Sequence, residues 1–400
     1  WYPRLGTAKP AVSAEVIVPD DYEVCTEGRR IDLPASVGER AVRFESELPS
    51  QGATLIAARR HVRVQMLGEL ALRTFLRDPT QHEAIADAVG AALTRYEDWL
   101  GRFPHPALSV VEIECEGLFA YPGLVLVDPS FLSATSPLAP SLAHEVLHGW
   151  LGHGVFPGPG GNWVEGLVTY LAEHQAALDL GHDAAFRLQL LQAHRNNAAG
   201  KRDLPLSLFR GSGDRATQAV GYAKAAMLFH MLRRELGDDA FFAALRELVR
   251  EHLFDDVGWD ELIVRFEAAS GRRLASFAVQ WWERTGAPRF AITDARQQLA
   301  DGGAAHLELV LSQSEPAYEL QLPVELVLAD GRSLSLDLDL DGSREQTLAL
   351  EAPAPVASLH LDPRFDVFRE LDPAELPVSL AELLGSPTLS LQLDDALDEE

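Results

Sequence analysis

The sequence predicts a multidomain α+β protein, in which a β domain precedes a helix-rich middle domain and a β-sandwich follows it. Three observations carry this prediction. Four hundred residues are too many for one ordinary hydrophobic core. Short apolar runs separated by turn residues fill the start of the chain, and a helical period in the middle changes to strict alternation after Pro288. We expect the boundaries at residues 1–63, 64–288 and 289–373, with an acidic tail over 374–400.

The first 63 residues show the pattern of strands. Apolar runs at 14–18 and 53–57 alternate with turn residues such as Pro19-Asp20-Asp21 and Glu27-Gly28. From Gln81 onwards, apolar residues recur at steps of three and four up to Leu100, which predicts an amphipathic helix. Strands are then expected at 108–113 and 124–127, and helices at 142–151, 164–178, 216–236 and 239–251.

After Pro288 the apolar residues recur at every second position. This alternation covers 306–311, 319–328, 333–340 and 347–350. The dipeptides Asp330-Gly331 and Asp341-Gly342 lie between these runs and predict hairpin turns. We therefore expect a small antiparallel β domain in this part of the chain.

Composition limits the classes of function. The net charge of −26, without a cluster of Lys and Arg, would repel a phosphate backbone, so we do not expect nucleic acid as a partner. No apolar run is long enough to span a membrane. Two cysteines, Cys25 and Cys115, exclude a disulfide scaffold and a cysteine-rich zinc site, and could form one bond or remain thiols. Because the first residue is Trp1 rather than Met, we expect an exported or excised mature form.

The run His144-Glu145-Val146-Leu147-His148 predicts a zinc site that binds one ion. Residues four apart lie on one face of a helix, so His144 and His148 can bind the same ion. Glu145 lies beside that ion, where its carboxylate can accept a proton from water. The alternative to a zinc site is an ordinary helix that carries two histidines and a surface glutamate without a metal. The apolar neighbours of this run indicate a buried helix, in which such a set is costly without a metal.

A third protein ligand is required to complete a catalytic zinc site. His153 is one candidate, but its spacing after His148 does not fit the metzincin pattern. Glu165, at the start of the next helix, is the better candidate, and the Gly/Pro loop 157–161 would bring it back to the metal. Alternatively, Glu165 forms only a capping box with Asn162.

These residues resemble the aminopeptidase N family of gluzincins. The run from His144 to His153 is similar to H-E-x-x-H-x-W-x-G-N, and the run from Trp163 to Tyr170 is similar to W-L-N-E-G-F-A-T-Y, with two residues fewer between the second His and Glu165. Residues 96–104 resemble Y-x-x-x-F-G-x-Y-P. The resemblance implies a partial N-terminal β domain, a thermolysin-like zinc catalytic domain and a C-terminal β-sandwich.

The resemblance also assigns roles to residues outside the zinc motif. Tyr222, in a segment similar to Y-x-K-G, would donate a hydrogen bond to the oxyanion of the tetrahedral intermediate. The family's G-x-M-E-N element corresponds to residues 117–121, so that Ala120 takes the place of the glutamate that binds the substrate's α-amine. Glu114 or Glu116 could substitute for it. Phe119 and Tyr121, with Ala120, are expected to line the substrate pocket.

The sequence therefore predicts a zinc metallopeptidase that hydrolyses peptide or protein substrates through a zinc-activated water, with aminopeptidase-like activity. Ala120 leaves two alternatives open. One is an endopeptidase, or a peptidase for blocked or unusual amino termini. The other is a non-enzymatic binding module on a peptidase fold. Oligomeric state and compartment do not follow from the sequence.

Overall fold

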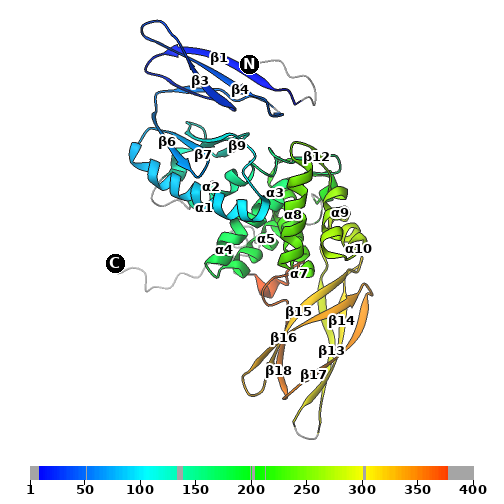
Figure 1. Ribbon diagram of the computed structural model, residues 1–400. Coiled ribbons are helices and arrows are strands. Elements are labelled where there is room, and N and C mark those ends of the chain that lie inside the picture. Colours follow the sequence, from blue (N-terminus) through cyan, green and yellow to red (C-terminus); the bar gives the residue numbers. More distant parts are fainter. Residues whose placement is uncertain are drawn as a thin grey trace, which may run out of the picture.

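The chain folds into a helical middle part flanked by strands at both ends (Figure 1). The computed structural model describes residues 9–376 except 51, 133–137, 199, 201–202, 212 and 301–302. Residues 377–400 of the expected acidic tail lie outside the described residues. No helix in the described part of the chain is long and apolar enough to cross a membrane.

The N-terminal part consists of antiparallel strands, as the sequence predicts. Its main sheet has the order β1-β4-β3, and a short pair, β2-β5, lies beside it. The bounds are β1 Val12–Pro19, β2 Glu23–Cys25, β3 Arg29–Leu33, β4 Glu39–Ser46 and β5 Ile56–Ala58. A small core of Val24, Val42 and Phe44 holds these strands together.

A five-stranded mixed sheet opens the middle part, with the order β6-β7-β8-β10-β9. The strands are β6 His61–Leu67, β7 Leu70–Leu76, β8 Ala107–Glu112, β9 Leu118–Tyr121 and β10 Leu124–Val127. β9 pairs only with β10 among the described strands and so forms one edge of the sheet. The expected boundary after residue 63 falls within β6, and the division into domains stays a prediction.

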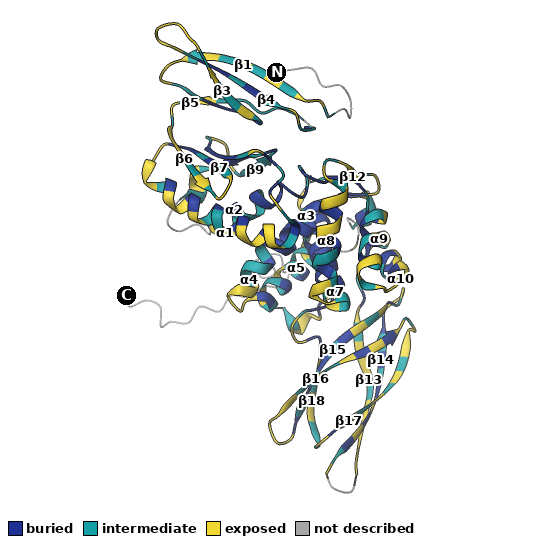
Figure 2. Cartoon of the chain, in the orientation of Figure 1, coloured by how far each residue is buried: buried dark blue, intermediate teal, exposed yellow. Residues whose placement is uncertain are grey.

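Helices pack behind this sheet and carry most of the buried residues (Figure 2). The long helices are α1 His82–Leu100, α2 Leu138–Leu147, α5 Asp183–Asn197, α7 Ala225–Leu236, α8 Asp238–His252 and α9 Trp259–Ser270. Short 3-10 turns lie at η1 Pro79–Gln81, η2 Pro129–Leu132, η4 Leu206–Leu208 and η7 Pro373–Glu375. A two-stranded parallel pair, β11 Phe156–Pro157 with β12 Asp256–Val257, connects distant segments beside α2.

Three helices contain a π-helical segment, in which each turn holds more residues than an α turn. The first combines α3 Val164–Thr169, η3 Tyr170–His174 and α4 Gln175–Asp179. The second combines α6 Arg215–Gln218, η5 Ala219–Lys224 and α7, and the third α10 Ala275–Ala278 with η6 Val279–Glu283. The sequence predicts the extents of the first two but not their change of period.

The C-terminal part has two three-stranded antiparallel sheets, with the orders β13-β14-β17 and β16-β15-β18. The strands are β13 Phe290–Leu299, β14 Ala305–Gln313, β15 Glu319–Leu328, β16 Ser333–Asp341, β17 Glu345–Ala352 and β18 Val356–Leu361. The hairpin predicted at Asp330-Gly331 is confirmed, because β15 pairs with β16. The hairpin predicted at Asp341-Gly342 is wrong. The chain turns there, but β17 pairs with β14 in the other sheet, so the turn joins the two sheets.

One continuous core joins the helices to the near half of the C-terminal sheets. It includes residues of α1, α2, α3, α7 and α8 together with Leu322, Val324, Leu338, Val367 and Phe368. The far half of these sheets has a separate small core. Cys25 is buried and Cys115 is exposed, and both are free thiols, so the cysteines do not pair.

Candidate metal centre

The two histidines of the H-E-x-x-H run lie on the same side of α2 and its last turn. The His148 N–H donates to the His144 carbonyl at 3.2 Å, as expected for residues four apart in a helix. The regular helix ends at Leu147 rather than at residue 151, because the next turn tightens into bonds between residues three apart. Val146 and Leu147 are fully buried and fix this helix against the core.

Three donor side chains converge at the start of α3. The Nε2 atoms of His144 and His148 are 3.2 Å apart, and Oε2 of Glu165 lies 3.9 Å and 3.6 Å from them. All three donor atoms lie within 4.8 Å of one another. Nδ1 of His148 lies 3.0 Å from the Leu151 carbonyl, which fixes the proton on Nδ1 and turns the Nε2 lone pair towards the cluster. Two imidazole nitrogens and one carboxylate form a donor set that fits zinc.

The electrostatics of this cluster favour positive charge. Burial opposes protonation of His148, but the hydrogen bond and charge of Glu165 outweigh it and raise the pKa of His148 to about 9. Burial likewise opposes ionisation of Glu165, yet the hydrogen bond with His148 and the charges of the imidazoles lower its pKa to about 2. The cluster therefore stabilises a cation, whether a proton or a metal ion.

The first turn of α3 directs Glu165 to the histidines and not back to its own helix end. Asn162 Oδ1 accepts from the Val164 N–H at 2.9 Å, while the Asn162 N–H donates to the Phe209 carbonyl at 2.7 Å. The reciprocal bond of a capping box is therefore absent. In the Gly/Pro loop before α3, Gly161 has φ +116°, and a Cβ there would collide with the Leu206 carbonyl. The loop needs glycine at this position.

Glu145 lines the same cavity as the three donor residues. Burial raises the pKa of its carboxyl group, and the charges of His148 and His144 partly oppose that shift. A carboxylate whose pKa is raised, adjacent to the donor cluster, is suited to accept a proton and pass it on.

Tyr222 reaches the site from η5, where its hydroxyl hydrogen-bonds to the Glu165 carboxylate. Two glycines permit close packing around this contact. A Cβ at Gly166 would collide with Ala225, so Gly166 lets the helix of Glu165 lie close to the helix of Tyr222. A Cβ at Gly221 would collide with the ring of Phe209, so Gly221 lets that ring pack against the helix of Tyr222.

Glu173 is a site residue that sequence reasoning missed. Its Oε1 lies 2.8 Å from Nδ1 of His144, although the angle departs from that of a hydrogen bond. Glu173 follows Glu165 by eight residues, and one α turn followed by one π turn advances about eight residues. The π segment η3 thus places both carboxylates on one face. The only signal in the sequence is an acidic residue on the same helix, which is too common to identify it.

β9 forms one wall of the cavity, which has a volume of about 420 Å³. Phe119, Ala120 and Tyr121 all line it, together with His153. His153 Nε2 donates to the Ala120 carbonyl at 3.0 Å, so this histidine contacts β9 and is not part of the donor cluster.

The two acidic residues considered as substitutes at Ala120 do not line the cavity. Glu114 is exposed and pairs with Arg77. Glu116 is also exposed. Among the described residues, the only carboxylates that line the cavity are therefore those of Glu145 and Glu165.

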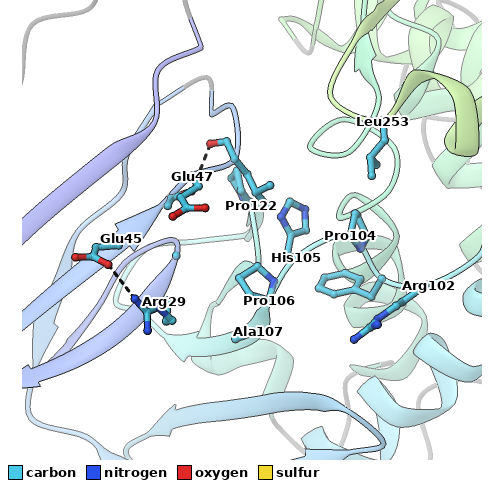
Figure 3. A pocket seen from close by; sticks show the side chains of 14 residues that line it. Arg29, Glu45, Glu47, Arg102, Pro104, His105, Pro106, Ala107, Pro122 and Leu253 are labelled. Carbon is cyan, nitrogen blue, oxygen red and sulfur yellow. Dashed lines mark hydrogen bonds and ion pairs between the residues drawn. The ribbon is translucent and has the colours of Figure 1, made fainter.

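A larger hollow of about 660 Å³ lies between the N-terminal sheet and residues 102–107 (Figure 3). The described residues that line this hollow include no group of side chains that could bind a metal ion together. We therefore do not assign the candidate site to this hollow, although it is larger than the cavity beside His144 and His148. His105 in its wall donates through Nε2 to the Gly149 carbonyl at 3.0 Å. This bond supports the turn that follows the second histidine of the motif.

Comparisons with known proteins point to one group of enzymes. No family model matches the chain. Over 70 residues, 18% of this chain and 8% of the relative, the chain is 39% identical to aminopeptidase N of Lactococcus lactis subsp. lactis. Over 225 residues, 50% of this chain and 25% of the relative, it is 24% identical to aminopeptidase M1-B of Oryza sativa subsp. japonica. The chain thus spans a quarter or less of the length of these curated relatives.

A solved structure shares the fold. The crystal structure of Legionella pneumophila aminopeptidase A in complex with aspartic acid aligns with a TM-score of 0.68 at 19% identity. The alignment covers 94% of this chain and 46% of that chain. The predicted multidomain α+β fold class is confirmed.

Proposed function

Because the chain belongs to the aminopeptidase N (M1) family, we propose that it is a zinc metallopeptidase with aminopeptidase-like activity on peptides. The observation that carries the proposal is the convergence of three donor atoms within 4.8 Å in a cavity that also contains Glu145. His144, His148 and Glu165 would hold one zinc ion. When bound, zinc supplies Lewis-acid polarisation of the scissile carbonyl and promotes ionisation of water near neutral pH.

Glu145 is the general base in this proposal. Its carboxylate accepts a proton from the attacking water and delivers it to the nitrogen of the leaving amine. Burial raises the pKa of Glu145, which favours the protonated form that must donate to the amine.

Tyr222 stabilises the oxyanion in this proposal. Its hydroxyl already hydrogen-bonds to Glu165, so it lies within reach of an oxygen that develops charge beside the donor cluster. A donor that is positioned before the reaction stabilises the transition state more than the ground state. Glu173, which contacts His144, would hold that imidazole in its ligating orientation.

The test of this function is Glu145→Gln, with Glu308→Gln on an exposed strand position as the matched control. We expect Glu145→Gln to lower kcat by at least about 100-fold, while elemental analysis still finds one zinc per chain. Full activity of Glu145→Gln would contradict the mechanism. If the wild-type chain bound no stoichiometric zinc, a non-enzymatic binding module on this fold would become the better explanation.

One observation favours a second candidate, a peptidase that cleaves internal bonds or acts on blocked amino termini. The only carboxylates of described residues that line the cavity are Glu145 and Glu165, and both have roles in the zinc mechanism. Within the part of the chain that the structure describes, no further carboxylate lines the cavity at Ala120 to bind an α-ammonium group. Comparing cleavage of free and N-acetylated versions of one peptide separates the candidates, because the second predicts that acetylation does not slow cleavage.

A further inference from the structure

We propose that His153, Ala120 and Tyr121 form a wall that closes one end of the cavity and limits cleavage to the first residue of a peptide. In this proposal the wall selects the amino-terminal residue by size and not by the charge of its α-amine. The inference rests on the proposed peptidase function and names the residues that set its specificity.

Two contacts hold the wall together. His153 Nε2 donates to the Ala120 carbonyl at 3.0 Å, and the imidazole stacks on the Tyr121 ring with a centroid distance of 6.5 Å and an angle of 19°. A carbonyl oxygen only accepts hydrogen bonds, so Nε2 carries the proton. The imidazole therefore contacts β9 in two ways: its Nε2 bonds to the Ala120 carbonyl, and its ring face stacks on Tyr121.

The hydrogen bond also lies on the free edge of the sheet. Tyr121 pairs with Leu124 across the two-residue turn Pro122-Gly123, and Ala120 pairs with Val125. In such a hairpin the residues next to the turn form the hydrogen-bonded pair, so the polar groups of Ala120 point away from β10. Extended peptides pair with free strand edges of this kind. His153 already bonds to the Ala120 carbonyl, so a peptide that pairs along this edge of β9 meets the imidazole at this residue.

Tyr222 contacts a different residue of the donor cluster from the one that the wall approaches. The rings of His153 and His148 lie 6.5 Å apart, Glu165 lies 3.6 Å from His148, and the Tyr222 hydroxyl bonds to Glu165. The wall thus approaches the donor cluster at His148, and Tyr222 contacts it at Glu165. Tyr222 also lines a second hollow of about 690 Å³ between α5 and α6. In the proposal, a peptide crosses the cluster with its amino-terminal residue against the wall and its leaving-group side towards this second hollow.

The chemistry of the wall determines which substrates fit. A methyl group, a phenol ring and an imidazole that has donated its N–H to a carbonyl offer no negative charge to an ammonium group. A desamino substrate, in which propionyl replaces the amino-terminal alanyl residue, should therefore bind almost as well as the alanyl peptide. One additional amino-terminal glycine should collide with the wall.

Three peptides that share one scissile bond test the proposal in the wild-type zinc enzyme. We expect kcat/KM of the propionyl peptide to lie within about threefold of the alanyl peptide, and that of the glycyl-extended peptide at the same bond to fall by more than about tenfold. A loss of about 100-fold for the propionyl peptide would show recognition of the amine and overturn the proposal. Absence of zinc-dependent cleavage of every peptide would instead contradict the proposed function.

Variants of the wall supply the second test. We expect His153→Ala and Tyr121→Ala to release dipeptides, with the ratio of dipeptide to single-residue products raised at least about tenfold. His153→Gln keeps an N–H donor near the same position and should release single residues, and the exposed His182→Ala is the matched control. Mass spectrometry of the products gives the ratio, and elemental zinc and thermal melting show that each variant is intact.

Binding to the inactive Glu145→Gln protein gives a readout that does not depend on turnover. Calorimetry should show that the glycyl-extended peptide binds at least about tenfold more tightly when His153→Ala is added. Unchanged product ratios and unchanged binding in intact His153→Ala and Tyr121→Ala variants would overturn the proposal while leaving the peptidase function in place.

Discussion

The hydroxyl of Tyr222 hydrogen-bonds to the carboxylate of Glu165, which joins the π segment of one helix to the first turn of another. The two residues are 57 positions apart in the sequence, and Gly166 lets the two helices approach, because a Cβ there would collide with Ala225. The bond keeps the phenol beside the donor cluster before any substrate arrives. A group that is already in place needs little reorganisation when charge develops on the substrate oxygen.

Tyr222→Phe should therefore impair the chemical step. We expect kcat to fall by about 100-fold to 1000-fold, with KM changed little and zinc content unchanged. Steady-state kinetics on one peptide, with elemental analysis of the same samples, provide the measurement. A variant with wild-type kcat would show that Tyr222 only packs against Phe209.

Glu173→Gln should weaken metal binding. Glu173 contacts the outer nitrogen of His144, and loss of such a carboxylate costs about 10-fold to 100-fold in metal affinity. Competition with a chelator measures the zinc dissociation constant, and Glu308→Gln serves again as the surface control. Equal affinity in the two variants would mean that the His144 orientation is set by the helix alone.

The features that the sequence predicts correctly depend on residues close together in the chain. The spacing of His144 and His148 follows from the period of one helix, and the donor cluster needed only one further residue, Glu165, close in sequence. The strand at Glu319–Leu328 and its hairpin at Asp330-Gly331 are equally local, since the two paired strands adjoin the turn.

Contacts that depend on register or on distant segments could not be predicted in this way. Glu173 contacts His144 because a π turn shifts its position along the helix. No residue pattern in the sequence predicts that turn. The dipeptide Asp341-Gly342 signals a turn but does not specify which strand β17 will join. The bond from His153 to Ala120 links residues 33 apart, and it depends on how the sheet packs against helix α2.

Gly166→Ala should destabilise the protein and displace Glu165. A Cβ at this position would collide with Ala225 on the facing helix, and overpacking of this kind costs about 1–3 kcal/mol. Gly90→Ala is the matched control, because its Cβ would have ordinary contacts on helix α1 and should stabilise the protein by about 0.5–1 kcal/mol. Chemical denaturation gives both values. Similar stability changes in the two variants would contradict the close helix packing.

The stability of the protein should fall as the pH decreases from 7 to 5, in part because of His105. Burial lowers the pKa of His105 to about 4, although its bond to the Gly149 carbonyl favours the charged form. Below about pH 6.5 the unfolded chain binds a proton at this residue that the folded chain does not bind. The free energy of unfolding therefore decreases with falling pH in this window, by about 2 kcal/mol at pH 5 for this one group.

His105→Gln isolates the contribution of this group. Glutamine does not titrate and can still donate an N–H to the Gly149 carbonyl, so the variant should lose less stability than the wild type between pH 7 and pH 5. Urea denaturation at the two pH values provides the comparison, and His182→Ala on the exposed end of α5 is the control. If the wild type and His105→Gln lose stability equally, folding does not lower the pKa of His105, and the prediction is wrong.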